Sequence, residues 1–356
     1  MISEFSPDYK TARRRFLEAA RKAGGRLQSL RLDAKGPSGE DLAIDIASFG
    51  TENPDAVVLH SSGLHGVEGF AGSAIQLAAL DRLAELEGDP ALILVHILNP
   101  FGMSWLRRVN ENNVDLNRNC VVDGCYSGAP PRYAMLDSFL NPKSPPSPDF
   151  YLAKAALLVA RYGLKTLRQS VAQGQYEYPQ GLFFGGRHRE KGTADFEAFL
   201  RRELPATKTL IGIDVHTGLG PYGKDTLLVV PGDHERMRGW FGVAVAASEA
   251  DRSGGYRVTG GIESMLADVF PGAKRYLICQ EFGTFSPIKV LGALRQENRL
   301  HHFGSRAMDH PARELLLRAF CPEDEQWQRS VVDRGKTLLM RALRLLPRLT
   351  ARGRRR

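Results

Sequence analysis

Separate segments of this 356-residue sequence carry side chains with the chemistry of a hydrolytic metal site. His65 and Glu68 lie three positions apart, and His216 and Glu281 follow in two later segments. A catalytic zinc ion needs three protein ligands and one open position for water, and two histidines with one glutamate are an established set. A further carboxylate, such as that of Glu281, could serve as a base. These segments together could therefore supply the parts of a catalytic zinc site.

Each of these residues is weak evidence on its own. A His-x-x-Glu pair arises by chance in many chains of this length, and a lone His216 is more often a hydrogen-bonded histidine than a metal ligand. Glu281 is more unusual, because a carboxylate at the end of an apolar strand is costly unless it is paired or bound to a metal. The prediction of a site depends on the combination.

The candidate residues follow segments that have the pattern of buried strands. Short apolar runs at 56–59, 91–98, 210–215 and 275–281 are typical of such strands. A helix over roughly 69–87 lies between the first two runs, and this strand–helix–strand order implies a parallel pair. Because open α/β sheets bind ligands at the carboxyl ends of their strands, we expect the candidate residues to meet there.

The remaining sequence predicts a single α/β domain. A helix at 7–22 and a hairpin of strands at 26–32 and 42–49 come first, and helices at 150–173, 193–203 and 235–250, a strand at 225–230 and a loop at 123–149 follow. We expect a mixed, mostly parallel twisted sheet with helices on both faces. The catalytic domain is expected to span residues 1–333, and a basic helix and tail, with the helix ending near Pro347, the remaining residues 334–356.

The formal net charge of +8 is local to the carboxyl-terminal segment. Residues 334–356 contain nine lysines and arginines and no acid, which leaves residues 1–333 with a net charge of about −1. A broad basic face for nucleic acid is therefore not expected, although contact of the tail with RNA or a membrane surface is an alternative. No signal peptide or apolar run of about 20 residues is visible, which predicts a cytoplasmic protein.

Six motifs follow one another between about residues 56 and 285: His65-Gly66-Val67-Glu68, Asn99-Pro100-Phe101-Gly102, Arg107-Arg108-Val109-Asn110, Val114-Asp115-Leu116-Asn117-Arg118-Asn119, Asp214-Val215-His216-Thr217-Gly218 and Glu281-Phe282-Gly283-Thr284-Phe285. Their order and rough spacing resemble the zinc carboxypeptidase superfamily. Within it they are most similar to the uncharacterised bacterial branch related to succinylglutamate desuccinylase and aspartoacylase.

The resemblance implies a role for each residue that matches a motif. It makes His65, Glu68 and His216 the ligands of one zinc ion and Glu281 the general base that takes a proton from the zinc-bound water. Arg108 matches the arginine that polarises the substrate carbonyl, and the neighbouring Arg107 is the alternative match.

The resemblance also implies residues that bind the substrate. Asn117 and Arg118 match the pair that grips a substrate carboxylate, for which the planar guanidinium is well suited. Tyr222 is a candidate for the substrate-capping tyrosine, or else a packing residue in a Gly-Pro turn. Asp214 could orient a ligand imidazole or be a structural carboxylate.

The leading prediction is a zinc-dependent hydrolase that cleaves an amide bond next to a free carboxylate, as a carboxypeptidase-like metallopeptidase acting on small peptides. An N-acyl amino acid deacylase is the alternative, and the motifs do not separate the two. A non-catalytic protein that binds nucleic acid or a membrane surface through the basic tail is the alternative from another class.

Overall fold

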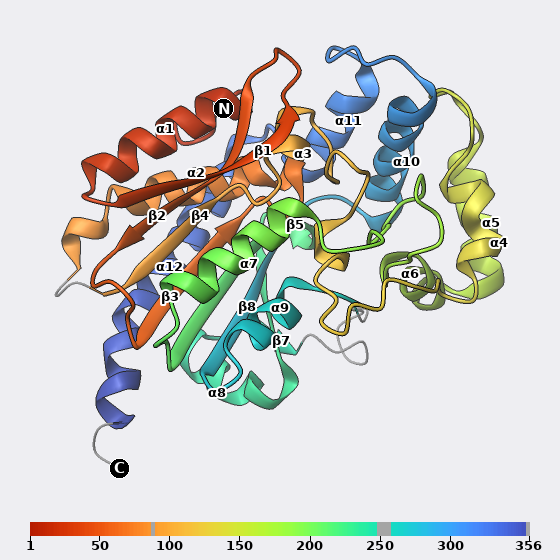
Figure 1. Cartoon of the computed structure of the whole chain (residues 1–356). Helices are drawn as coiled ribbons and strands as arrows, with labels where there is room; N and C mark the ends of the chain where they lie inside the picture. The colour runs from red at the N-terminus through yellow and green to blue at the C-terminus, as the bar shows by residue number, and fades with distance from the viewer. Residues whose placement is uncertain (87–89, 248–257, 354–356) are drawn as a thin grey trace.

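The computed structural model describes residues 1–86, 90–247 and 258–353, which contain one eight-stranded sheet (Figure 1). Its strands are β1 (Arg26–Lys35), β2 (Asp41–Phe49), β3 (Ala56–Ser62), β4 (Leu92–His96), β5 (Thr209–Tyr222), β6 (Asp225–Val229), β7 (Val245–Ala247) and β8 (Lys274–Gly283). They are arranged in the order β1-β2-β4-β3-β5-β8-β6-β7. The central strands β4, β3, β5 and β8 are parallel, whereas β1, β2 and β6 pair antiparallel with their neighbours nearer the centre. The predicted mixed, mostly parallel sheet is confirmed.

Helices cover both faces of the sheet, as predicted. They are α1 (Tyr9–Lys22), α2 (Gly69–Leu80), α3 (Pro100–Ser104), α4 (Tyr133–Leu140), α5 (Tyr151–Tyr162), α6 (Leu164–Ala172), α7 (Lys191–Glu203), α8 (His234–Phe241), α9 (Ile262–Val269), α10 (Pro287–Phe303), α11 (Pro311–Phe320) and α12 (Glu325–Gly353). Because strand side chains alternate between faces, Val58 packs with residues of α1, α2 and α12, whereas Val57 and Leu59 pack with residues of α7 and α9. The parallel strands are therefore buried on both sides.

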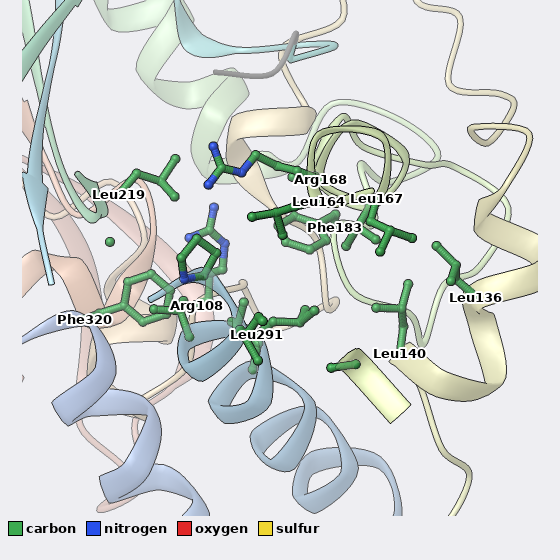
Figure 2. Close-up of a pocket in the computed structure, with 18 of the residues that line it drawn as sticks. Arg108, Leu136, Leu140, Leu164, Leu167, Arg168, Phe183, Leu219, Leu291 and Phe320 are labelled. Carbon is green, nitrogen blue, oxygen red and sulfur yellow. The ribbon is translucent and has the colours of Figure 1, made fainter. Parts of the chain in front are cut away.

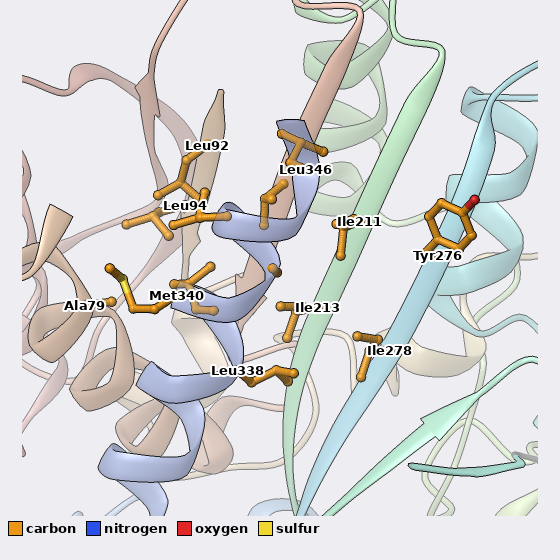
Figure 3. Packing of buried hydrophobic residues seen from close by; sticks show 14 of the residues in the cluster. Ala79, Leu92, Leu94, Ile211, Ile213, Tyr276, Ile278, Leu338, Met340 and Leu346 are labelled. Atoms are coloured by element: carbon orange, nitrogen blue, oxygen red, sulfur yellow. The ribbon is translucent and has the colours of Figure 1, made fainter. Parts of the chain in front are cut away.

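The basic carboxyl-terminal helix is part of the core. Figure 3 shows Leu338 and Leu346 of α12 on the side of Ile211 and Ile213 of β5, and Met340 toward Ala79 of α2. α12 begins at Glu325, before the expected start at 334, and it does not end near Pro347 as predicted. A proline inside a helix costs about 3 kcal/mol. Apolar contacts on both sides of it, by buried Leu346 and partly buried Leu349, offset that cost.

Other sequence-based boundaries were also wrong, and the helix predicted over 69–87 ends at Leu80. The segment predicted as a 123–149 loop contains α4, whose Tyr133, Leu136 and Leu140 are buried. The helix predicted over 150–173 is two helices, because Gly163 takes a φ of 77° between them. The helix predicted over 235–250 ends at Phe241, before Gly242 with a φ of 94°, and β7 follows; positions 248–250 lie outside the described residues.

Helices α4, α5, α6 and α10 lie together to one side of the sheet (Figure 1). Buried side chains of α4, α6, α10 and α11 share an apolar cluster with Val67, which lies between the candidate ligands His65 and Glu68. None of the helices in the described residues is both long and apolar enough to cross a membrane.

Candidate metal centre

Two strand ends and one turn bring the candidate residues together. β3 ends at Ser62, and after a turn the short 3-10 helix η1 (Gly66–Glu68) places His65 and Glu68 beside each other. Gly66 has no room for a side chain, since a Cβ there would lie 2.0 Å from the carbonyl carbon of Gly102. His216 on β5 pairs in register with Glu281 on β8. The expectation that these segments meet is therefore confirmed.

The atoms of His65, Glu68 and His216 converge on one point, and all three residues are buried. His65 Nδ1 lies 2.9 Å from Glu68 Oε1, and His216 Nδ1 lies 3.2 Å from Glu68 Oε2. One potential ligand atom from each residue lies within 4.8 Å of the others. Short distances of this kind around a common centre are those of a metal-ligand set.

Carboxylates hold the far side of both imidazole rings. His65 Nε2 lies 3.0 Å from Asp115 Oδ1, and His216 Nε2 lies 2.6 Å from Asp214 Oδ2. Asp214 also accepts a hydrogen bond of 2.6 Å from Ser61 Oγ. Metal-binding histidines usually donate their second ring N–H to a carboxylate, which fixes the tautomer and orientation. The sequence indicated this role for Asp214 as one option but missed it for Asp115, because nothing in its spacing relates it to His65.

The chemistry of the site fits a divalent cation. Buried His65 Nδ1 lies 2.9 Å from Glu68 Oε1 without the geometry of a hydrogen bond to any described residue, so a cation between the two atoms would satisfy both. Burial alone would raise the pKa of Glu68, but His65, His216 and Arg108 hold it below its usual value. In the same way Arg118, His65 and Arg108 hold the pKa of buried Asp115 well below its usual value. Both side chains are therefore carboxylates that a cation would neutralise.

The side chains of the two adjacent arginines have different partners. Arg108 Nη1 donates to Glu68 Oε1 at 2.8 Å, and its Nη2 lies 2.8 Å from His65 Nε2. Arg107 faces elsewhere: its Nε donates to Glu297 Oε1 at 2.7 Å and its Nη2 to Asn113 Oδ1 at 2.9 Å. The geometry therefore favours Arg108 over Arg107 as the arginine of the site.

Glu281 lies next to the cluster but outside the ligand set. Its Oε1 accepts a hydrogen bond of 2.8 Å from the Leu219 backbone N–H. Burial raises the pKa of Glu281 to about 7, with the negative charge of Glu68 adding to the rise and His216 opposing it. A carboxyl group with a pKa near neutrality is suited to accept and return a proton.

The raised pKa of Glu281 predicts a pH-dependent stability of the metal-free protein. The folded pKa exceeds the unfolded value of about 4.5, so this group's contribution to stability is complete below about pH 4.5 and is lost as the pH rises to about 7. The glutamine side chain of Glu281→Gln does not titrate. At pH 8 the metal-free variant should therefore have an unfolding free energy up to about 3 kcal/mol above that of the metal-free wild type. Urea unfolding at pH 5 and pH 8 measures this difference. An equal difference at both pH values would contradict the prediction.

The residues predicted to bind the substrate lie outside the wall of the pocket beside the cluster. Arg118 is fully buried, and its Nε and Nη2 donate to the Ala172 carbonyl. Asn117 Oδ1 accepts a hydrogen bond of 3.2 Å from the Ile262 backbone N–H. Tyr222 is half exposed at the end of β5, where its hydroxyl lies 3.4 Å from Asp324 Oδ2. Asn117, Arg118 and Tyr222 are not among the residues that line the pocket beside the cluster. Their roles in substrate binding stay predictions.

A large pocket opens beside the cluster. Its volume is about 1100 Å³ when its open mouth is included. His65, Glu68, Arg108 and Glu281 form part of its wall, and the helices α4, α5, α6 and α10 supply most of the rest. Figure 2 shows Arg108 and Arg168 at its polar end. Sequence reasoning missed Arg168, because it lies in a helix without any motif.

The fold and the site define an α/β protein with a buried His–Glu–His cluster that could hold a metal ion, at the carboxyl ends of parallel strands. The chain belongs to the family described as "Protein of unknown function (DUF2817)", whose model matches residues 5–334. No curated protein matches the chain.

Three solved structures are similar to this chain over most of its length. A predicted metallopeptidase of Shewanella amazonensis SB2B is 16% identical, with a TM-score of 0.43 over 83% of this chain and 92% of that one. Thrombin activatable fibrinolysis inhibitor is 12% identical, with a TM-score of 0.46 over 92% and 74%. A predicted succinylglutamate desuccinylase/aspartoacylase family protein of S. amazonensis SB2B is 19% identical, with a TM-score of 0.41 over 78% and 71%. Likenesses at this level say nothing of the activity of this chain.

Proposed function

We propose that the protein is a zinc-dependent hydrolase that cleaves an amide bond next to a free carboxylate, as a carboxypeptidase-like metallopeptidase. One observation carries the proposal. The Nδ1 atoms of His65 and His216 converge with the Glu68 carboxylate, while buried Glu281 faces the same pocket. Three ligands plus a nearby base are the parts that hydrolysis of an unreactive amide needs.

Each residue has a part in the proposed reaction. His65, Glu68 and His216 would hold the zinc ion, which when bound makes water more acidic and polarises a carbonyl oxygen. Glu281 takes a proton from the attacking water and returns it to the leaving nitrogen.

Arg108 has to change partners for its proposed role. With its Nδ1 as a metal ligand, His65 would carry the proton on Nε2 and donate it to Asp115, so Nε2 would no longer accept from Arg108. Repulsion between the metal and the guanidinium acts in the same direction. Arg108 is then available to stabilise the oxyanion that forms on the substrate. Asn117 and Arg118 are proposed to bind the substrate carboxylate, and Tyr222 to cap the substrate.

An N-acyl amino acid deacylase is the second candidate, and the apolar character of the pocket favours it. The alternative of a nucleic-acid or membrane-binding protein has weaker support. The leucine face of α12 is buried in the core, so this helix does not offer an apolar face to a membrane. Location in the cytoplasm stays a prediction.

The metal content of the purified protein tests the proposal. We expect about one zinc ion per chain by atomic emission, and hydrolysis of carboxylate-bearing amides that stops on chelation and returns with zinc. His216→Ala removes a ligand and should abolish stoichiometric binding, whereas His188→Ala, outside the cluster, should not. A wild-type protein that retains no zinc and hydrolyses no such amide would sink the proposal.

A further inference from the structure

The pocket beside the cluster is far more apolar than binding of a metal and a carboxylate requires. Its wall away from the cluster contains aliphatic side chains from four helices: Leu136 and Leu140 of α4, Leu158 and Val159 of α5, Leu164, Leu167 and Val171 of α6, and Val290, Leu291 and Leu294 of α10. The same cavity reaches His65, Glu68 and Glu281. One continuous space thus joins the metal-ligand cluster to an aliphatic region.

The polar and apolar parts of the pocket lie at opposite ends. Figure 2 shows Arg108, Leu219 and Phe320 at one side of the cavity and Leu136 and Leu140 at the other. Beyond the cluster, the only cationic side chain among the described lining residues is that of Arg168, whose nitrogen-bearing end lies on the side of Arg108 (Figure 2). A ligand that fits this distribution has a polar, anionic end at the cluster and a long apolar end.

The size of the apolar part argues against a single amino-acid side chain as its occupant. Figure 2 shows the labelled aliphatic residues of the wall extending from Leu291 and Leu164 near Arg108 to Leu136 and Leu140 at the far side of the cavity. A leucine or phenylalanine side chain would leave most of the aliphatic wall uncovered. Apolar surface without a partner forfeits the stabilisation that burial gives, about 25 cal/mol per Å².

We propose that this region binds a long unbranched acyl chain, so that the substrate is an N-acyl amino acid with a fatty acyl group. The proposal rests on the second candidate function, the N-acyl amino acid deacylase, and names its substrate class. Water adds across the amide bond: its oxygen forms a bond to the acyl carbon, the C–N bond breaks, and the two protons are shared between the products. A fatty acid and a free amino acid result.

The outer surface of the pocket wall is consistent with an apolar ligand. Phe150, Leu152 and Leu157 in and before α5 are 86%, 68% and 70% exposed, although Ala155 of the same helix is buried and lines the pocket. α5 therefore has apolar side chains on both of its sides. An acyl chain that enters beside this helix meets apolar surface before it reaches the interior.

Binding measured without turnover tests the proposal separately from catalysis. The zinc-loaded Glu281→Gln variant is titrated by calorimetry with N-acylglycines from acetyl to dodecanoyl, below their micelle concentrations. Affinity is expected to rise roughly two- to fourfold per methylene group through the series, because each buried CH₂ contributes about 0.8 kcal/mol at most. Affinity that does not grow beyond the butanoyl chain would overturn the proposal, as would tighter binding of peptides with a carboxyl-terminal phenylalanine.

Substitution inside the pocket locates the acyl chain. Ala155→Phe fills the cavity from α5 and should weaken binding of N-dodecanoylglycine at least tenfold while leaving N-acetylglycine unchanged. Ala156→Phe, on the exposed side of the same helix, is the matched control and should change neither. Leu291→Phe narrows the cavity from α10 and replaces Ala155→Phe if that variant does not fold. Equal binding of the long chain by the pocket variants and the control would overturn the proposal.

Measuring binding and hydrolysis together distinguishes failure of the acyl-chain site from failure of the hydrolase function. If the dodecanoyl ligand binds in the pocket but neither N-acyl amino acids nor peptides are hydrolysed, the proposed hydrolase function fails and the acyl-chain site stands. If short peptides are hydrolysed and acyl chains are not bound, the hydrolase stands and the acyl-chain site fails.

Discussion

Glu281→Gln is expected to lower kcat by about 10²- to 10⁴-fold while the zinc content stays at about one ion per chain. Glutamine keeps the shape of the side chain and can still hydrogen-bond, but its amide does not accept a proton from water. The three ligand residues are unchanged, and Glu281 lies outside the set whose atoms converge. The expected signature is an equal loss in kcat and kcat/KM, because proton transfer occurs only in the transition state.

The measurement needs steady-state kinetics and metal analysis on the same preparation. Glu263→Gln, an exposed carboxylate on α9, is the matched control and should keep wild-type activity and metal content. Retained activity in Glu281→Gln would assign the base to another residue. Loss of zinc together with activity would make Glu281 a fourth ligand.

The position of the site at the carboxyl ends of the strands could be predicted from the sequence, because that position depends on a local pattern of apolar and polar residues. Apolar runs identify the buried strands, and polar residues directly after them must lie at the carboxyl edge of a parallel sheet. His65 follows the end of β3, and His216 and Glu281 lie side by side on β5 and β8 just past the level where β3 ends. The register that pairs His216 with Glu281 follows from the paired starts of β5 and β8, where Thr209 lies opposite Lys274.

Other features depend on contacts between distant residues, which no local pattern contains. Asp115 holds His65 across the turn, and Arg168 reaches the pocket from a helix that carries no motif. Pro347 ends a helix by local rules, but core packing of α12 overrides them. The orientations of Arg107 and Arg108 also depend on tertiary partners, since neighbouring side chains of an irregular segment have no fixed relation.

Glu297→Ala is expected to lower the unfolding free energy by about 3–5 kcal/mol, a far larger effect than most single substitutions have. Glu297 on α10 and Arg107 are both almost fully buried, and their side chains are 2.7 Å apart. A second buried cation, Arg313, lies 4.0 Å from the same carboxylate oxygen. Without Glu297, two guanidinium groups remain in the interior with no carboxylate between them, and the Nη1 of Arg107 already lacks a hydrogen-bond partner among the described residues.

Urea unfolding of the zinc-loaded protein measures the loss, and Glu314→Ala is the control. Glu314 pairs with Arg318 on the surface of α11, where both side chains are more than half exposed, so its loss should cost less than about 1 kcal/mol. The double variant Arg107→Met, Glu297→Leu should recover part of the stability, because it removes charge together with its partner. An effect of Glu297→Ala as small as that of Glu314→Ala would contradict a structural role for Arg107. A large effect would mean that the two adjacent arginines have different roles. Arg107 holds α10, which forms part of the pocket wall, whereas Arg108 faces the His65–Glu68–His216 cluster.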